Sequence, residues 1–468
     1  MLVADARADS AGDTTRQLIE ALRANGTLTD AQYEELNSGR DADAAGSEAV
    51  VRTLIDVLHR QGTIDAATYR ALSGEAEPAS AEAPTTTAVA TPSVKIATGT
   101  GGLTVESADG ASGFTLGGRV HVDAGFFDDD DSSIGNATEV RRARIEMSGW
   151  LAHDWQLASA VDFGSDDVSL KSTYVRYVGF DPVEITVGYL SEPFGLERRT
   201  SANVSTFMER AAPTTAFSPD RNVGISASTH GSHWSLALGA FGEGADNANA
   251  NGTDESFGVT GRATFAPVAE EAKVLHLGVS SSYRDYDGGA EFERAERWET
   301  HLTDAELVDT GVLTDVDDGA VFAAESAFVY GPVSLQGEYF GNFLHREDGA
   351  PDAYLDGWYA YASWVLTGES RLYSAKRGVF EGIKPRRGVG DGGYGAWELG
   401  TRFSELDLGD EDINGGRQRL LTVGLNWYAR ANIRFMANYV DVLDLDRPGT
   451  PENGDEPSVF QFRSQVNF

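Results

Sequence analysis

The chain has 468 residues, with 73 acidic against 37 basic side chains and a formal net charge of −36. It contains no cysteine, which excludes disulfides, thiolate metal sites and cysteine nucleophiles. The negative charge disfavours binding to duplex nucleic acid, because a phosphate backbone requires a positive protein surface. No run approaches the ~18 consecutive apolar residues of a membrane-spanning helix. A transmembrane β-barrel remains compatible, because its strands alternate in polarity.

Composition divides the chain into three zones. Residues 1–73 are predicted to be helical, residues 74–95 form an Ala-, Pro-, Thr- and Glu-rich disordered linker, and residues 96–468 consist of short alternating segments separated by Gly, Asp and Asn. The chain starts without the basic and apolar segments of a signal peptide. For an exported protein, we therefore expect the signal to be absent from this numbering.

The helical zone contains an internal repeat. Residues 14–36 align with residues 50–72 without a gap, and nine of the 23 positions are identical. Each unit is predicted to form a helix that ends at a glycine, Gly26 or Gly62, followed by a second short helix. Because a two-helix unit of this size buries little by itself, we expect the repeats to pack on each other or on copies from other chains. A plain helical spacer is the alternative.

The third zone is predicted to be all-β. In residues 114–126, even positions such as Leu116 and Val120 are apolar, whereas odd positions such as Arg119 and His121 are polar or charged. Side chains of a strand alternate between its two faces, so one face is apolar and the other charged. We count sixteen such segments up to the C-terminus. An even number suits a closed antiparallel barrel with both termini on one side of a membrane.

Connection lengths also favour a transmembrane barrel. Tight turns, as at His153 and Asp181-Pro182, alternate with long polar connections such as 286–318, an asymmetry typical of outer-membrane barrels. The last strand ends on an aromatic residue, Phe468, as in the signal that the outer-membrane assembly machinery recognises. We therefore predict a 16-stranded antiparallel transmembrane β-barrel in outer-membrane lipid, preceded by the short α-helical repeat.

Two connections depart from this pattern. Counted from a periplasmic N-terminus, the 191–221 segment falls on the extracellular side, yet it contains Phe194, Leu196 and Phe207. Apolar side chains of this size are unfavourable in water, so we predict that the segment folds into the lumen and constricts it. The 368–394 segment falls on the short-turn side and has an excess of basic residues in an acidic chain. We predict that it enters the barrel from the periplasmic end; a periplasmic flap is the alternative.

Motifs in the β zone resemble the phosphate-selective porin O/P family. GGRVHVD at 117–123 is similar to the family's first barrel strand, VRRAR at 140–144 to its second, and the PFGLE and FMER motifs within 187–210 to its constriction loop. The order of these motifs is more specific than any one of them. The resemblance implies a homotrimeric outer-membrane porin that transports inorganic anions such as phosphate along a path lined by arginine and lysine. It also implies a periplasmic helical segment before the barrel.

Strand alternation predicts which arginines face the lumen, and two-step spacing places neighbouring arginines on one face. Phosphate is bound by planar bidentate donors together with neutral hydroxyl and amide donors. Transport also requires several weak sites in series. We therefore predict passive, anion-preferring diffusion. The predicted anion path comprises Arg142, Arg144 and Arg176 on strands, Arg198, Arg199, Ser201, Asn203, Ser205, Thr206 and Arg210 in the 191–221 segment, and Lys376, Arg377, Lys384, Arg386 and Arg387 in the 368–394 segment.

Other functions fit the same sequence. If the arginines pair with neighbouring carboxylates, the barrel would be a general, weakly selective porin. The helical repeat could instead tether the outer membrane to periplasmic or cell-wall partners, with the barrel as its anchor. An enzyme is not predicted, because the eight histidines form no recognisable constellation with a serine and an acid. No cofactor is predicted either, and we interpret His230 and His233 as a surface pair rather than metal ligands.

Overall fold

The structure is a computed structural model, and it describes residues 94–99, 101–164, 168–245, 255–286 and 291–468. The chain divides into two compact units, Met1–Ala90 and Thr91–Phe468. The predicted helical repeat at 1–73 and all but the last two residues of the predicted linker lie outside the described residues. Among the residues that are described, no helix is long and apolar enough to cross a membrane.

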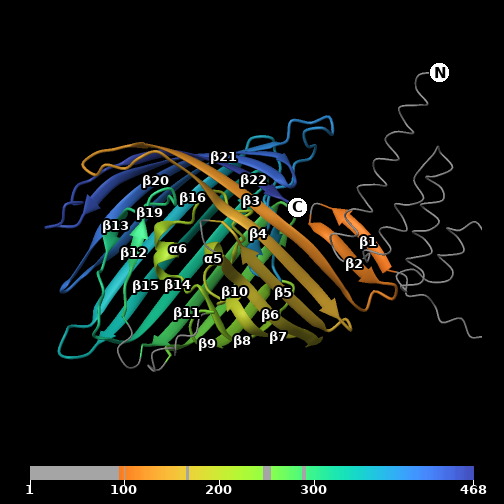
Figure 1. Ribbon diagram of the computed structural model, residues 1–468, viewed down its shortest axis with the longest axis horizontal. Coiled ribbons are helices and arrows are strands. Elements are labelled where there is room, and N and C mark those ends of the chain that lie inside the picture. Colours follow the sequence, from red (N-terminus) through yellow and green to blue (C-terminus); the bar gives the residue numbers. More distant parts are fainter. Residues whose placement is uncertain (1–93, 100, 165–167, 246–254, 287–290) are drawn as a thin grey trace, which may run out of the picture. The chain divides into compact units, whose positions relative to one another are not determined.

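Sixteen antiparallel strands form a closed barrel (Figure 1), as the sequence predicts. Each strand pairs with the next along the ring, and the last strand, β22, pairs with the first, β3, so that Arg463 lies opposite Asp123. The strands are β3 Gly113–Asp128, β4 Ala137–Leu151, β5 Trp155–Asp162, β6 Ser169–Phe180, β7 Val183–Ser191, β8 Arg221–His230, β9 Trp234–Phe241, β10 Phe257–Glu270, β11 Lys273–Asp285, β14 Val316–Tyr330, β15 Val333–Arg346, β16 Ala353–Val365, β19 Ala396–Asp410, β20 Ile413–Arg430, β21 Ile433–Asp446 and β22 Ser458–Asn467.

Alternating polarity decides which face of each strand points outward. On β3, Val122 and Phe126 are 45% and 58% exposed, whereas His121 and Asp123, on either side of Val122, are 0% and 2% exposed. The alternation of apolar and polar side chains along each strand therefore gives the barrel an apolar outer surface and a polar inner surface, as expected for a barrel in lipid.

The two ends of the barrel differ in their connections. At one end, called here the turn end, short reversals join β4 to β5, β6 to β7 and β14 to β15. At the other, called the loop end, long connections join β7 to β8 and β11 to β14, although β19 and β20 meet there in a tight hairpin. Gly331 occupies the turn between β14 and β15 with a φ of 57°, a conformation that glycine adopts without a steric penalty. The long connection between β16 and β19, residues 366–395, is an exception at the turn end.

A hairpin precedes the barrel and extends its sheet. Strands β1 (Val94–Gly99) and β2 (Gly102–Ser107) pair with each other, and β2 pairs with the first residues of β3, with Leu103 opposite Leu116. The closed ring itself begins at β3. Every residue of β1 is exposed. The hairpin is not predicted from the sequence, because 94–107 is a short stretch that adjoins the linker.

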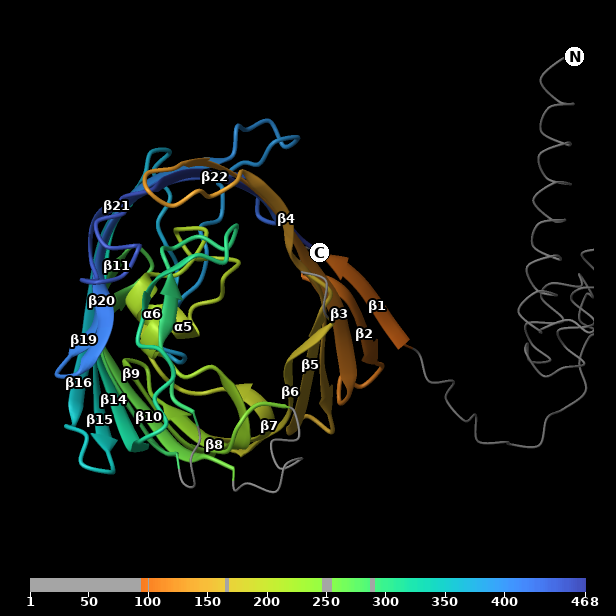
Figure 2. The ribbon, with the colours of Figure 1, turned by 60° about the vertical axis from the view of Figure 1, so that its left-hand side comes forward.

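Several connections fold into the ring rather than away from it. The 191–221 segment carries two short helices, α5 (Leu196–Arg199) and α6 (Ala212–Phe217), and both lie inside the ring in Figure 2. Phe194 and Phe217 each lie against Phe340 of β15, with ring centroids 6.4 Å apart. The largest hydrophobic cluster among the described residues therefore fills the space between this segment and the inner wall of the later strands.

Two short hairpins complete the contents of the ring. In the loop-end connection between β11 and β14, β12 (Ala295–Arg297) pairs with β13 (Glu306–Asp309), and Trp298 between them is fully buried. In the connection between β16 and β19, β17 (Tyr373–Ser374) pairs with β18 (Val379–Phe380). Arg262 of β10 donates a 2.7 Å hydrogen bond to the carbonyl of Gly378, which holds this second hairpin against the inner wall.

Candidate functional site

A cavity of about 760 Å³ lies between the 191–221 segment and the inner wall formed by β3 to β7. This is the side of the ring that the inner segments leave uncovered in Figure 2. Glu146 is the one acidic side chain among the described residues that line the cavity. Seven arginines line it: Arg119, Arg142, Arg144, Arg198, Arg199, Arg210 and Arg221. We call it the arginine cavity.

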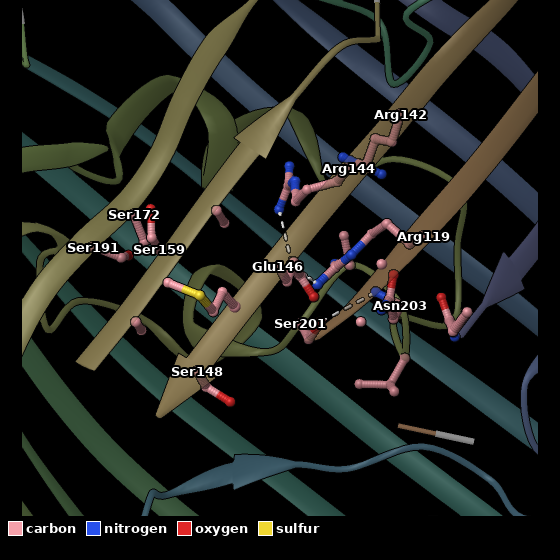
Figure 3. Close-up of a pocket in the computed structure, with 18 of the residues that line it drawn as sticks. Arg119, Arg142, Arg144, Glu146, Ser148, Ser159, Ser172, Ser191, Ser201 and Asn203 are labelled. Atoms are coloured by element: carbon pink, nitrogen blue, oxygen red, sulfur yellow. Dashed lines mark hydrogen bonds and ion pairs between the residues drawn. The ribbon is translucent and has the colours of Figure 1, made fainter. Parts of the chain in front are cut away.

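Two of these arginines form a paired cluster on the strands. Arg144 of β4 lies opposite Arg119 of β3 in the sheet register. Figure 3 shows both guanidinium groups turned toward Glu146, which forms ion pairs with each of them. Arg144 also lies 2.8 Å from a carboxylate oxygen of Asp162 on β5. The positive charge of this cluster is therefore largely compensated by neighbouring carboxylates.

A second pair of cavity arginines shares one acid at the loop end. Arg198 of α5 and Arg221 of β8 both form ion pairs with Asp220, the second at 3.4 Å. Arg141, next to the cavity, is likewise paired, with Glu209 of the 191–221 segment at 3.0 Å. The Arg141–Glu209 pair fastens the segment to the wall, whereas the two pairs with Asp220 lie within the segment itself.

The remaining three cavity arginines form no ion pair with any carboxylate among the described residues. Arg142 has His121 Nδ1 as its partner, 3.1 Å from Nη1. Arg199 donates to the carbonyl of Ser191 at 2.9 Å. Arg210 donates to three backbone carbonyls of the 191–221 segment at 3.2 to 3.4 Å. Their hydrogen-bond partners are neutral, so their positive charge remains available to a ligand in the cavity.

The protonation of two of these three groups follows from their surroundings. Burial, together with the nearby charge of Arg262 and Arg176, lowers the pKa of Arg199 to about 10. Burial and the neighbouring Arg198 lower the pKa of Arg210 to about 10. Both groups therefore remain cations at neutral pH, although each is easier to deprotonate than an arginine in water.

His121 positions Arg142 and the inner segment together. A guanidinium has only donors, so His121 Nδ1 accepts the hydrogen bond from Arg142 and its Nε2 carries the proton. That Nε2 lies 3.2 Å from Oδ1 of Asn203 and donates to it. Gln465 of β22 in turn donates to the carbonyl of Asn203 at 2.9 Å. Strand alternation predicts that His121 faces inward, but its partner, 82 residues away, could not be predicted from the sequence.

The other predicted residues of the 191–221 segment separate into two groups. Ser201 and Asn203 line the arginine cavity, where they supply neutral donors. Ser205 and Thr206 do not line it, because their hydroxyl groups donate to the carbonyl of Phe207 at 3.0 Å and to Glu398 at 3.4 Å. On the wall, the predicted Arg176 also lies outside the cavity lining and pairs with Glu184 at 3.5 Å.

The five predicted basic residues of the 368–394 segment lie outside the lining of the arginine cavity. Lys376 is 2.8 Å from Glu184, and Arg377 pairs with Glu381. Lys384, Arg386 and Arg387 are exposed in the second half of the segment. The structure therefore divides the segment into an inner hairpin and an exposed basic stretch.

Two further arginines of the cavity are not part of the predicted anion path. Alternation predicts that Arg119 faces inward, but nothing in the sequence assigns it to the path. Arg221 carries no such signal, because it is the first residue of β8 and strand boundaries are uncertain from sequence. Both line the arginine cavity. In the part of the chain that is described, no group of three or more His, Asp or Glu side chains is arranged to hold a metal ion.

Comparisons with known proteins agree with this architecture. The family model described as phosphate-selective porin O and P matches residues 114–468. Porin O of Pseudomonas aeruginosa is 28% identical over 405 residues, covering 79% of this chain and 91% of that protein. An uncharacterized protein of Caulobacter vibrioides is 31% identical over 377 residues, covering 77% of this chain and 75% of that protein.

Among solved structures, the anion-selective porin from Comamonas acidovorans is similar in fold, with a TM-score of 0.50 and 13% sequence identity. The similarity covers 76% of this chain and 100% of that one. The family match extends from the start of β3 to the last residue, so it includes the whole barrel and nearly all of the cavity lining. The chain therefore belongs to the phosphate-selective porin O and P family, whose members are channel-forming barrels of the bacterial outer membrane and not enzymes.

Proposed function

We propose that this porin conducts anions passively through the arginine cavity, with phosphate as a preferred ion. The observation that carries the proposal is the set of three cavity arginines, Arg142, Arg199 and Arg210, that have only neutral hydrogen-bond partners among the described residues. Guanidinium groups bind phosphate through parallel hydrogen bonds. Ser201 and Asn203 beside them supply neutral donors without adding negative charge. The description of the family as phosphate-selective agrees with this choice of ion.

The 191–221 segment acts in this proposal as the constriction. Glu338 of β15 accepts hydrogen bonds from the backbone N–H groups of Leu196 at 2.6 Å and Glu197 at 2.8 Å. Glu197 in turn accepts from the hydroxyl of Thr214 at 2.7 Å. These bonds fix the segment before an ion arrives, so its arginines need not reorganise during transport.

A path of this kind favours permeation over tight capture. Arg119 and Arg144 are compensated by Glu146 and Asp162, which limits the total attraction for an anion. The three arginines with neutral partners then act as separate weak sites, as conduction requires. We further propose a homotrimer whose turn end faces the periplasm. The inner hairpin of the 368–394 segment would contribute Lys376 to the periplasmic side of the path.

A general, weakly selective porin is the second candidate. The observation that favours it is the pairing of most inner-wall arginines with carboxylates, as in Arg262 with Glu325 at 2.6 Å and Arg463 with Asp123 at 2.6 Å. If the cavity charge had little influence on ions, the barrel would discriminate mainly by size.

Reversal potential across a potassium chloride gradient separates the two candidates. The purified protein is reconstituted in planar bilayers, and the triple variant Arg142→Gln, Arg199→Gln, Arg210→Gln is compared with the wild type. We expect the anion-to-cation permeability ratio to fall by roughly tenfold, because three uncompensated charges leave the cavity. Block of chloride current by phosphate should also weaken.

The matched control is Arg417→Gln, Arg419→Gln, Arg430→Gln, which removes the same charge from side chains outside the cavity lining. An equal change in both triple variants would assign the effect to net charge. An unchanged reversal potential in the cavity variant would favour the weakly selective porin.

A further inference from the structure

We propose that the turn end of the barrel carries a binding site for the phosphate group of an anionic phospholipid in the adjoining leaflet. The site, called here the turn-end basic patch, consists of Lys384, Arg386, Arg387 and Tyr394 in the connection between β16 and β19. All four residues are exposed, and none of them lines the arginine cavity. The patch is therefore a separate feature, and its function does not depend on the ion that the pore conducts.

An aromatic row on the outer surface marks the edge of the lipid-facing belt beside the patch. Trp397 of β19 stacks on Trp427 of β20 with ring centroids 5.5 Å apart. Trp427 stacks on Phe435 of β21 at 5.4 Å, and Phe435 on Phe462 of β22 at 6.3 Å. Tryptophan and other aromatic side chains gather in this way at the level of lipid headgroups in transmembrane barrels.

Direct hydrogen bonds join the patch to this row. The indole N–H of Trp427 donates to the carbonyl of Tyr394 at 2.8 Å. The N–H of Val389 donates to the carbonyl of Ala429, near the end of the same strand, also at 2.8 Å. A 3.2 Å bond from the N–H of Gly395 to the carbonyl of Arg387 closes the stretch on itself. The patch therefore lies directly at the water side of the aromatic row, where lipid phosphates are found.

Two acids lie near the patch, and neither forms an ion pair with one of its cations. Asp391, the nearest acid in the same stretch, is engaged by Arg430 at 2.9 Å. Glu369 accepts hydrogen bonds from the backbone N–H of Arg386 at 3.1 Å and from the hydroxyl of Thr367. Lys384 and Arg387 form no ion pair with any carboxylate that the structure describes.

The same side chains provide the donors that a phosphodiester accepts. Arg386 uses one guanidinium nitrogen, Nη2, to donate to the carbonyl of Gly368 at 2.6 Å, and its other donors remain available to a ligand. Tyr394 is 87% exposed, which is unusual for so large a ring in a folded stretch. A tyrosine at a membrane surface places its ring against lipid and its hydroxyl in water. Positive charge beside an exposed aromatic ring at this level fits an anionic lipid better than a protein partner.

Retention of lipid by the full-length protein tests the proposal. The protein is purified in detergent and incubated with dioleoyl phosphatidylglycerol or with dioleoyl phosphatidylcholine, and bound lipid is counted by native mass spectrometry. We expect the wild type to retain more phosphatidylglycerol. The variant Arg386→Gln, Arg387→Gln should lose at least about fivefold in retained phosphatidylglycerol, because two charges leave the site.

The matched control is Arg417→Gln, Arg419→Gln, which removes the same charge near the loop end of β20, where both arginines pair with carboxylates. Equal losses in both variants, or no preference of the wild type for phosphatidylglycerol, would overturn the proposal. Displacement of the lipid by millimolar inorganic phosphate would show that the patch takes the free ion and would overturn it too. If the double variant does not fold, the same lipid measurement is made on Arg387→Gln alone. The Arg387 side chain has no hydrogen-bond partner among the described residues, so its replacement should not disturb folding.

Discussion

At the scale of single residues, cavity arginines that lie close together can have quite different hydrogen-bond and ion-pair partners. Arg142 and Arg144 lie two residues apart on β4, yet Arg144 pairs with Asp162 whereas Arg142 meets the imidazole of His121. An ion-paired arginine contributes little net field, because its partner cancels most of its charge at a distance. We therefore propose that the cavity arginines with neutral partners set the ion preference.

His121 is predicted to control the position of Arg142. The substitution His121→Leu removes the acceptor at Nδ1 and the donor at Nε2, so Arg142 and Asn203 both lose a partner. We expect the anion-to-cation permeability ratio to fall severalfold in bilayer recordings while single-channel conductance changes less. His121→Gln retains one acceptor and one donor and should recover part of the ratio. An unchanged ratio in His121→Leu would limit His121 to a packing role.

The lowered pKa values of Arg199 and Arg210 predict a loss of anion preference in alkali. Both groups have a pKa of about 10, so each loses its positive charge as the pH rises through that value. The permeability ratio should therefore stay level from neutral pH to about pH 9 and decline above it. Reversal potentials measured along this range check the prediction. The double variant Arg199→Gln, Arg210→Gln should show a lower ratio at neutral pH and a weaker decline.

At the scale of elements, the 191–221 segment is held in the ring by buried contacts. Phe207 is 1% exposed and packs edge-on against Tyr361 with ring centroids 5.5 Å apart. The guanidinium of Arg402 lies 4.5 Å from the centre of the Phe207 ring. The segment is therefore anchored to β16 and β19, on the side of the ring away from the arginine cavity, and its other edge faces that cavity.

Loosening this anchor should widen the pore. Phe207→Ala removes a buried ring and should cost about 3–5 kcal/mol of local stability. We expect single-channel conductance to rise and to fluctuate more, because the segment can leave its position beside the wall. The outward-facing Phe126, 58% exposed, is the matched control, and Phe126→Ala should leave conductance unchanged. A Phe207→Ala channel with wild-type conductance would show that the segment does not limit the flow of ions.

At the scale of the whole barrel, one buried side chain links the closing strands to the 191–221 segment. Arg463 of β22 is fully buried and forms ion pairs of 2.6 Å with Asp123 of β3 and with Glu209 of the inner segment. It also donates to the carbonyl of Met208 at 2.5 Å. The same guanidinium therefore joins the last strand, the first strand and the 191–221 segment.

Removing Arg463 should destabilise the closed barrel. Arg463→Ala leaves the buried Asp123 without its cation and takes one of two cations from Glu209, which costs about 3–5 kcal/mol. The temperature at which the folded barrel unfolds in detergent, followed by the shift in mobility on gel electrophoresis, should fall clearly below that of the wild type. Arg430→Ala, which breaks the exposed pair with Asp391, should leave this temperature nearly unchanged. Equal temperatures for Arg463→Ala and the wild type would contradict the assigned role.

Local patterns in the sequence were enough to predict the strands, their number and the face that most of their side chains occupy. Alternation has a period of two, so the inward position of Arg142, Arg144 and His121 follows without knowledge of the fold. The inward folding of the 191–221 segment is also predictable, because its large apolar side chains require burial. The β1–β2 hairpin is not, since its pairing depends on the free edge that β3 offers beyond β22.

Whether an arginine is paired with a carboxylate depends on contacts between residues that are far apart in the sequence. Local sequence patterns do not predict such contacts. Arg141 meets Glu209, 68 residues away, and Arg463 meets the same carboxylate across 254 residues. Partners so distant in the sequence are brought together by closure of the barrel and by the inward fold of the 191–221 segment. Attraction between charges depends on their distance in space, which spacing along the chain does not record. The sequence therefore identifies most arginines of the cavity, and the fold determines which of them are paired with carboxylates.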